Sequence, residues 1–97
     1  MTTINLALTN GELYSGCCIT EVGGRMNLTT PVNEATNIVG HNINAIVAAT
    51  TDRDQVTLTG PMAVWSYLIV FHAVVHSFRE VYYDDGRGNR VLIAAHG

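Results

Sequence analysis

The chain has 97 residues, of which 47% are hydrophobic and 13% are charged, and its formal net charge is −3. All five basic residues are arginines, which argues against binding to DNA or other long duplexes, because proteins that bind those usually present a basic face. The length predicts a single domain over residues 1–97, and a domain this small buries only about 60–65% of its unfolded surface. We therefore expect a homodimer or a larger homo-oligomer, in which more surface is buried.

The first thirty residues predict strands. Residues 4–9 alternate apolar with small or polar side chains, which is typical of a half-buried strand, and they lead into an Asn10-Gly11 turn. Residues 13–22 and 26–29 predict a second and a third strand, joined by a turn at Gly23-Gly24. Together they predict a meander and a β-rich N-terminal half.

Two adjacent cysteines, Cys17 and Cys18, lie within the second of these segments. A disulfide between neighbours is strained, and the N-terminus lacks the basic and apolar regions of a secretory signal. We expect reduced thiols and a cytoplasmic protein.

The middle of the chain carries the weakest pattern. Residues 31–42 predict a loop with one turn of helix near residues 33–38. In residues 42–49 the helix and strand propensities conflict, and we expect a strand. Residues 55–59 alternate as a strand that runs into Gly60-Pro61.

A long helix is predicted over residues 62–78, which contain no Asp, Glu, Lys or Arg. Gly60-Pro61 marks its start, because the fixed φ and missing N–H of proline are tolerated in the first turn. Both of its faces are apolar, which indicates a helix that is buried or covered by a partner chain. A membrane span is the rival interpretation, but the segment is short for one and two histidines inside it would be costly in lipid.

The last third predicts a strand over residues 80–83, a loop over residues 85–89 and a strand over residues 90–95. The loop is rich in Gly, Asp and Asn, which suits a hairpin. The strand before the helix and the strand after it should be parallel. These elements predict an α+β fold, a small mixed sheet with one long buried helix between strands.

His72 and His76 stand four residues apart, so their rings are neighbours on one helix face. This spacing suits two nitrogen ligands of one metal ion, while the simpler interpretation is a pair of core or interface histidines. Asp84 and His96 end the next two strands, so a carboxylate and a third imidazole are candidates for the same site. Such a set suits Mn²⁺, Zn²⁺ or Fe²⁺.

The turn at Thr59-Gly60-Pro61 is a candidate phosphate-binding site, because N–H groups at a helix start bind anions and Gly60 admits a close ligand. It lies at the opposite end of the helix from His76. One chain would use both only for a ligand that spans the helix or bridges to a second subunit. Arg87 and Arg90 are candidate phosphate contacts, or they keep the hairpin soluble.

The C-terminal part carries a family resemblance. The motifs are Val56-Thr57-Leu58-Thr59-Gly60-Pro61, the apolar helix with its histidines, Val81-Tyr82-Tyr83-Asp84, and Val91-Leu92-Ile93-Ala94-Ala95-His96. In this order they resemble the Csx-three family of CRISPR accessory proteins over residues 56–97. That family belongs to type III systems and is described as manganese-dependent ring nucleases or RNA deadenylases. The resemblance implies a CARF-like fold and Mn²⁺ as the cofactor.

Carried over by position, the resemblance implies that His76 and Asp84 are catalytic and that His72 and His96 join them at the metal. It also matches Gly60-Pro61 to the helix-opening turn of the family and places Arg87 close to an arginine of the family. We expect Thr59, Gly60 and Arg87 to contact the substrate. We therefore expect a metal-dependent phosphodiesterase that cleaves cyclic oligoadenylate, first of all cyclic tetra-adenylate, or short RNA. The alternatives are a non-catalytic module that binds the cyclic nucleotide and a small metal-binding oligomeric protein.

Overall fold

The computed structural model describes residues 2–95, which form six strands and two helices. In chain order these are β1 (Thr2–Asn5), β2 (Ile19–Val22), β3 (Arg25–Leu28), α1 (Val32–Ala49), β4 (Gln55–Thr59), α2 (Val64–Val75), β5 (Glu80–Asp84) and β6 (Arg90–Ala95). The predicted α+β class with a small mixed sheet is confirmed.

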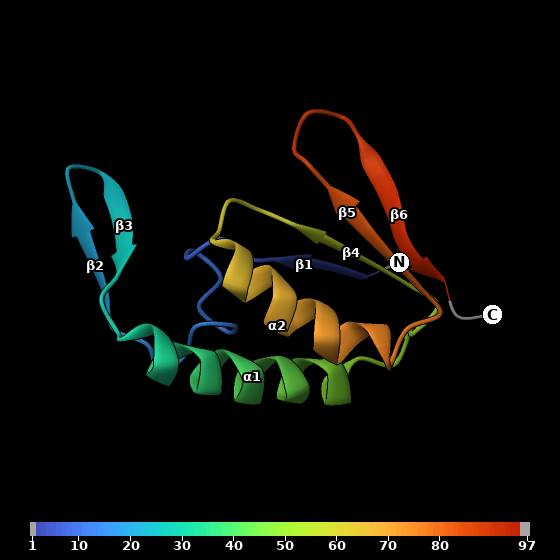
Figure 1. The fold of residues 1–97 in the computed structure, drawn as a ribbon, viewed down its shortest axis with the longest axis horizontal. Helices are drawn as coiled ribbons and strands as arrows, with labels where there is room; N and C mark the ends of the chain where they lie inside the picture. The colour runs from blue at the N-terminus through green and yellow to red at the C-terminus, as the bar shows by residue number, and fades with distance from the viewer. Residues whose placement is uncertain (1, 96–97) are drawn as a thin grey trace.

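The main sheet has the strand order β1-β4-β5-β6, and β2 pairs only with β3 in a separate hairpin. Strands β1, β4 and β5 are parallel, whereas β6 is antiparallel to β5. Figure 1 shows α2 lying against the sheet and α1 beside α2, with the β2–β3 hairpin standing apart from the other strands. The predicted parallel pair around the long helix and the predicted C-terminal hairpin are confirmed.

Helix α2 is shorter than predicted. It covers 12 residues instead of residues 62–78, because Ala63 is still extended and His76 already caps the last turn. Its fully buried residues, Ser66, Val70 and Val74, repeat every four positions. The side chains of Val64 and Leu68 are 72% and 62% exposed, so this apolar helix is only partly covered within the chain.

The strand predicted over residues 42–49 is wrong, and so is the loop predicted over residues 31–42, except for the turn of helix predicted near residues 33–38. Both segments belong to α1, an 18-residue helix that begins after Pro31, so the N-terminal half is not mainly β. The buried residues of α1 are Ala35, Val39, Ile43 and Val47, and their spacing of four places one apolar stripe against α2. Residues 42–49 have conflicting helix and strand propensities, and the packing of this stripe against α2 determines that they are helical.

The predicted meander is also wrong, because β1 pairs with β4 and not with β2. The strand predicted over residues 13–22 shrinks to Ile19–Val22, although the turn at Gly23-Gly24 leads into β3 as predicted. Residues 11–16 form turns that bring Leu13 and Tyr14 into the core. The buried Tyr14 hydroxyl donates a hydrogen bond to the Leu6 carbonyl. Since that uses its only proton, the buried Ser66 hydroxyl, 3.0 Å away, donates to Tyr14.

None of the helices described in residues 2–95 is long and apolar enough to cross a membrane.

The chain is closely packed where it passes from β4 to α2. Gly60 has a φ of +103°, which side-chain-bearing residues rarely adopt. A Cβ added there would overlap the Asn5 side-chain oxygen and lie 2.9 Å from the Ala7 nitrogen. That oxygen accepts a hydrogen bond from the same Ala7 N–H, so it is not free to move away. Glycine is therefore required at the point where the chain passes the end of β1.

We expect Gly60→Ala to lower the free energy of unfolding by about 2–4 kcal/mol, because backbone strain and overlap add at this position. Urea denaturation followed by circular dichroism measures the loss. Gly86 also has a positive φ, +77°, but no atom lies near an added Cβ. Gly86→Ala therefore measures the cost of the backbone strain without the overlap. Gly11→Ala has neither and serves as the neutral control. A Gly60→Ala variant as stable as Gly11→Ala would contradict this account.

Tyr67 braces the same turn from α2. Its hydroxyl donates a hydrogen bond to the Gly60 carbonyl, and its ring lies edge-on to Tyr83 at 5.5 Å between centroids. Burial, followed by the nearby tyrosines Tyr83 and Tyr14, raises the pKa of Tyr67 to about 12. The hydroxyl therefore stays protonated and remains a donor at neutral pH.

The raised pKa predicts how stability changes in alkali. The folded chain disfavours the Tyr67 phenolate, so the contribution of Tyr67 is complete below the unfolded pKa of 10.0 and is lost as pH rises toward about 12. In Tyr67→Phe, we expect a smaller fall in unfolding free energy across this interval. Urea titrations from pH 9 to 12 test this, with Tyr82→Phe as the control. An equal fall in wild type and Tyr67→Phe would contradict the prediction.

Candidate functional site

Three of the predicted site residues, Thr59, Gly60 and Asp84, meet at the carboxyl ends of β4 and β5. The Thr59 hydroxyl donates a hydrogen bond to the Asp84 carbonyl oxygen at 3.0 Å. Beside them lies a hollow of about 200 Å³, whose lining residues are Thr59, Gly60, Pro61, Tyr83, Asp84, Asp85 and Gly86. Ligands of open parallel sheets bind outside the carboxyl ends of the strands, and we name this hollow the carboxyl-edge hollow.

The two aspartates in this hollow also shape the β5–β6 turn. Asp84 accepts a hydrogen bond from the Gly86 N–H at 2.8 Å. Asp85 accepts one from the Asn89 side-chain amide at 2.9 Å and another from the Arg87 N–H at 2.7 Å. These bonds hold the pKa of Asp85 below its ordinary value. Arg87 therefore stands at a well-defined, exposed tip next to the hollow.

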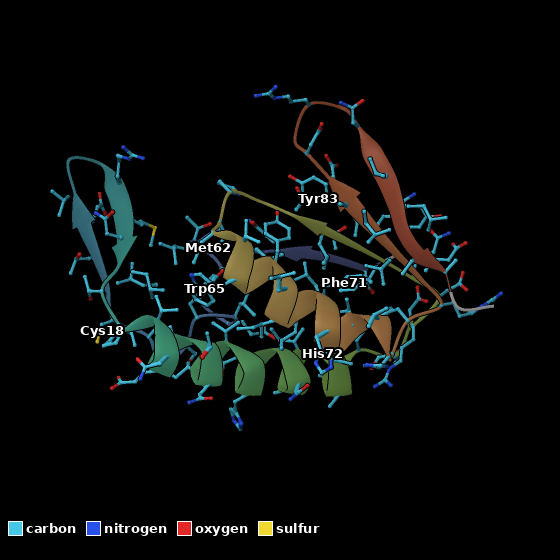
Figure 2. The ribbon with its side chains drawn as sticks, viewed as in Figure 1. Cys18, Met62, Trp65, Phe71, His72 and Tyr83 are labelled. Atoms are coloured by element: carbon cyan, nitrogen blue, oxygen red, sulfur yellow. The ribbon has the colours of Figure 1, made fainter. Side chains whose placement is uncertain are left out.

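His72 and His76 lie together at the other end of α2. Their ring centroids are 5.2 Å apart and the rings are perpendicular. Both are exposed and line a groove between the two helices, of about 580 Å³, together with Gly40, Ile43, Asn44, Leu68, Ile69, Ala73 and Ser77. Figure 2 shows His72 on the side of α2 that faces α1, away from Tyr83 on the sheet. We name this the interhelical groove.

The expected meeting of His76 with Asp84 does not occur within one chain. Helix α2 has 12 residues and is therefore about 18 Å long. Because β5 returns parallel to β4, Asp84 lies beside the start of α2, whereas His76 caps its end. Within residues 2–95, no three His, Cys, Asp or Glu side chains come together in a group able to hold a metal ion. His96 lies outside the described residues.

The donors of one chain therefore do not fit the predicted metal site of His72, His76 and Asp84. The interhelical groove offers two imidazoles and the Asn44 amide without a carboxylate among its lining residues. The carboxyl-edge hollow offers Asp84 and Asp85 without an imidazole. The interhelical groove and the carboxyl-edge hollow therefore each hold only some of the predicted metal ligands.

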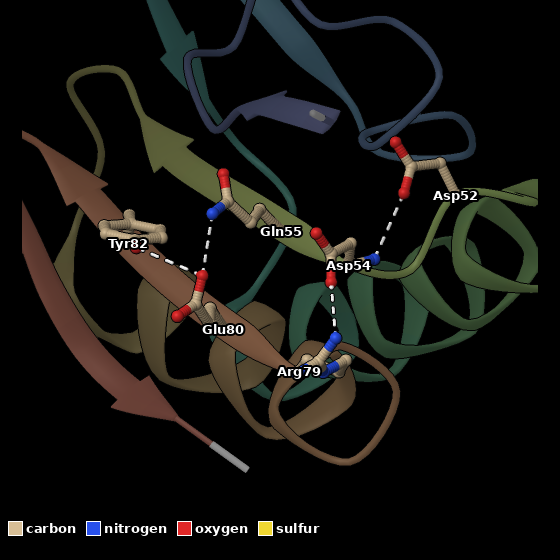
Figure 3. Close-up of polar contacts among 6 residues, drawn as sticks. All are labelled: Asp52, Asp54, Gln55, Arg79, Glu80 and Tyr82. Carbon is tan, nitrogen blue, oxygen red and sulfur yellow. Dashed lines mark hydrogen bonds and ion pairs between the residues drawn. The ribbon is translucent and has the colours of Figure 1, made fainter. Parts of the chain in front are cut away.

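A third group of polar residues lies near the amino ends of β4 and β5. Figure 3 shows the Glu80 carboxylate accepting hydrogen bonds from the Gln55 amide at 2.7 Å and from the Tyr82 hydroxyl at 3.2 Å. Arg79 and Asp54 form an exposed ion pair at 3.1 Å. Such exposed pairs contribute little, about 0–1 kcal/mol. These contacts join the neighbouring strands, and we assign them a structural role.

Two features of the surface went unnoticed in the sequence. Gly40 and Asn44 line the interhelical groove, and they were missed because their segments were predicted as loop and strand. The spacing of four between Val39, Ile43 and Val47 is the signal that indicates a helix there. A further hollow lies under the β2–β3 hairpin, and no local pattern predicts it.

The chemistry-bearing residues thus occupy two separated places, with Thr59, Gly60 and Asp84 at the carboxyl-edge hollow and the two histidines in the interhelical groove. Comparison of the chain with protein-family models, with curated proteins and with solved structures finds no match.

Proposed function

We propose that this protein is a cytoplasmic ring nuclease that binds cyclic oligoadenylate, with cyclic tetra-adenylate as the first candidate, and opens it by cleaving a phosphodiester bond. In a type III CRISPR system this reaction would end the second-messenger signal. The observation that carries the proposal is the meeting of Thr59, Gly60 and Asp84 at one hollow on the carboxyl edge of the sheet. The order of motifs from Val56 to Ala95 supports it by resemblance.

The active site of the proposal is shared between copies of the chain. One chain separates His76 from Asp84 by the length of α2. In the proposal, the histidines of one copy complete the carboxyl-edge hollow of another. Such an arrangement makes a homodimer or a larger homo-oligomer the active form. It also accounts for conspicuous apolar residues on the surface of a small chain, among them Leu68 and Ile93.

The roles of the residues follow from their chemistry. In RNA the ribose 2′-hydroxyl adjoins the scissile phosphate, and its attack on the phosphorus forms a 2′,3′-cyclic phosphate and breaks the bond to the 5′-oxygen, which leaves and takes up a proton. The protein therefore has to orient the 2′-hydroxyl and move protons. His76 carries an imidazole, whose ring nitrogen can accept a proton, and it takes the role of proton acceptor. Thr59 and the small Gly60 let the sugar-phosphate chain approach the backbone closely. Arg87, at the exposed tip, contacts a phosphate.

The proposal includes a divalent cation, with Mn²⁺ first. Asp84 and Asp85 place negative charge at the hollow where a phosphodiester would bind, and a cation offsets the repulsion. The donors within residues 2–95 do not complete its coordination, so the proposal links the metal requirement to the requirement for a second copy.

A second candidate function is a non-catalytic module that binds the cyclic nucleotide. The separation of His72 and His76 from the carboxylates favours it, because residues 2–95 of a single copy form a ligand hollow without an imidazole to transfer protons. Turnover separates the two functions, since a binding module leaves the ring intact.

Mixing two inactive variants tests the shared site. We expect His76→Ala and Asp84→Asn each to lower the cleavage rate of cyclic tetra-adenylate by about a hundredfold or more. In a randomly mixed two-fold dimer, half of the dimers carry one intact composite site, so an equimolar mixture should recover about a quarter of the wild-type rate. Cleavage is measured by chromatography of the products with Mn²⁺ and with EDTA. His41→Ala, which changes an exposed histidine on α1, is the control.

The outcomes discriminate sharply. An inactive mixture of two individually inactive variants would show that each site lies within one chain. Variants as active as wild type would remove His76 and Asp84 from the site. Wild-type protein that binds the ring and leaves it intact with either Mn²⁺ or EDTA would favour the binding module.

A further inference from the structure

The hollow under the β2–β3 hairpin adjoins the carboxyl-edge hollow. It measures about 450 Å³ and its lining residues are Ala7, Leu8, Thr9, Arg25, Met26, Pro61 and Met62. Pro61 belongs to the walls of both hollows, so the two lie side by side along the carboxyl edge of β1, β4 and β5. Figure 2 shows Met62 at the start of α2, on the side toward the hairpin. We name this the hairpin hollow.

The β2–β3 hairpin gains little from burial. Every residue from Thr20 to Asn27 is exposed, and two strands alone form only a marginally stable unit. It is held at its base, where the Thr29 N–H donates to the Cys18 carbonyl at 2.9 Å and the Cys18 N–H donates to the Thr30 hydroxyl at 2.7 Å. The hairpin therefore contributes little to the hydrophobic core. Its contribution is to form one wall of the hairpin hollow, through Arg25 and Met26.

The chemistry of the hairpin hollow suits a nucleotide. Met26, Met62 and Leu8 supply polarisable, adaptable apolar surface, against which a flat base can pack. Thr9 adds a hydroxyl able to bond to a base edge or a ribose. Arg25 forms no ion pair within residues 2–95, and its guanidinium is the group that best matches a phosphate. Few polar groups in an apolar wall are typical of small-molecule sites, as is a volume of this size.

We propose that the hairpin hollow binds a second nucleotide unit, adjacent to the one held beside Asp84, with its base against Met26 and Met62 and its phosphate at Arg25. The ligand of the carboxyl edge is then an oligonucleotide of at least two consecutive units and not a mononucleotide. This inference rests on the proposed function for the class of ligand. It adds the role of the β2–β3 hairpin, which lies outside the part of the chain that carries the family resemblance.

A binding experiment without turnover tests the inference. The probe is a fluorescent linear tetra-adenylate with 2′-O-methyl riboses, which lack the nucleophilic 2′-hydroxyl and so are not cleaved, titrated with protein in the presence of Mn²⁺. We expect Arg25→Gln and Met26→Ala each to weaken its Kd about 5- to 20-fold. Adenosine monophosphate is expected to bind in the carboxyl-edge hollow, so both variants should bind it with the affinity of wild type. In Arg25→Gln the slope of log Kd against log salt should fall by about 0.7, the value for one lost contact to a single-strand phosphate.

Two control variants match these changes away from the hollow. Arg79→Gln removes an exposed arginine near the amino ends of the strands, and Val22→Ala shortens an exposed apolar side chain of the same hairpin that does not line the hollow. Both should bind the probe as wild type does. Equal losses in the controls would overturn the proposal, because they would show a general effect on the fold or the charge.

The inference and the proposed function fail in different ways. An unchanged Kd and salt slope in Arg25→Gln and Met26→Ala would overturn the inference whatever the turnover, and so would wild-type protein that does not bind the probe. Weaker binding in both variants, with a ring that no form cleaves, would uphold the inference and leave a binding module. A probe bound normally by both variants, with normal ring cleavage, would leave the enzyme intact and free the hairpin for another partner.

Discussion

The close approach of two backbone segments at Gly60 is the constraint on which the rest of the structure depends. The Leu6 N–H donates to the Thr59 carbonyl at 2.7 Å, and Tyr67 binds the Gly60 carbonyl from α2. The end of β1, the end of β4 and the start of α2 are therefore one packed unit with no room for a side chain. Both hollows of the carboxyl edge are built on this unit, since each has Pro61 in its wall.

The parallel direction of β4 and β5 and the length of α2 together separate the histidines from the aspartates. A chain that leaves β4 through α2 and returns in a parallel strand must bring the end of the helix back to the amino end of the sheet. His76 and Asp84 are then separated by the whole of α2. Within residues 2–95, the histidines of the interhelical groove therefore lie apart from the carboxylates of the carboxyl-edge hollow. If the proposed function holds, catalysis would be a property of the assembly and would depend on protein concentration.

The surface of the chain carries exposed apolar residues that suit the proposed association of copies. Helix α2 contains no Asp, Glu, Lys or Arg, and the small chain covers only part of it. Strand β6 ends the sheet with three consecutive exposed apolar residues, Val91, Leu92 and Ile93. Soluble proteins usually protect such edges with charges or cover them. Joining copies through these surfaces would offset the limited burial that one chain of this size achieves.

The sequence by itself determined the elements that have strong local signals. The uncharged stretch before Phe78 predicts α2, Gly60-Pro61 predicts the sharp turn before it, and the Gly-rich loop after Asp84 predicts the β5–β6 hairpin. Tertiary structure decided the rest. Residues 42–49 are helical because Val39, Ile43 and Val47 pack against α2, and β1 pairs with β4, more than fifty residues away, which no local pattern reveals. The candidate residues were recognisable by type and order, but distance is a property of the folded chain: the length of α2 separates His76 from Asp84, and only the folded hairpin brings Arg25 and Met26 beside Met62.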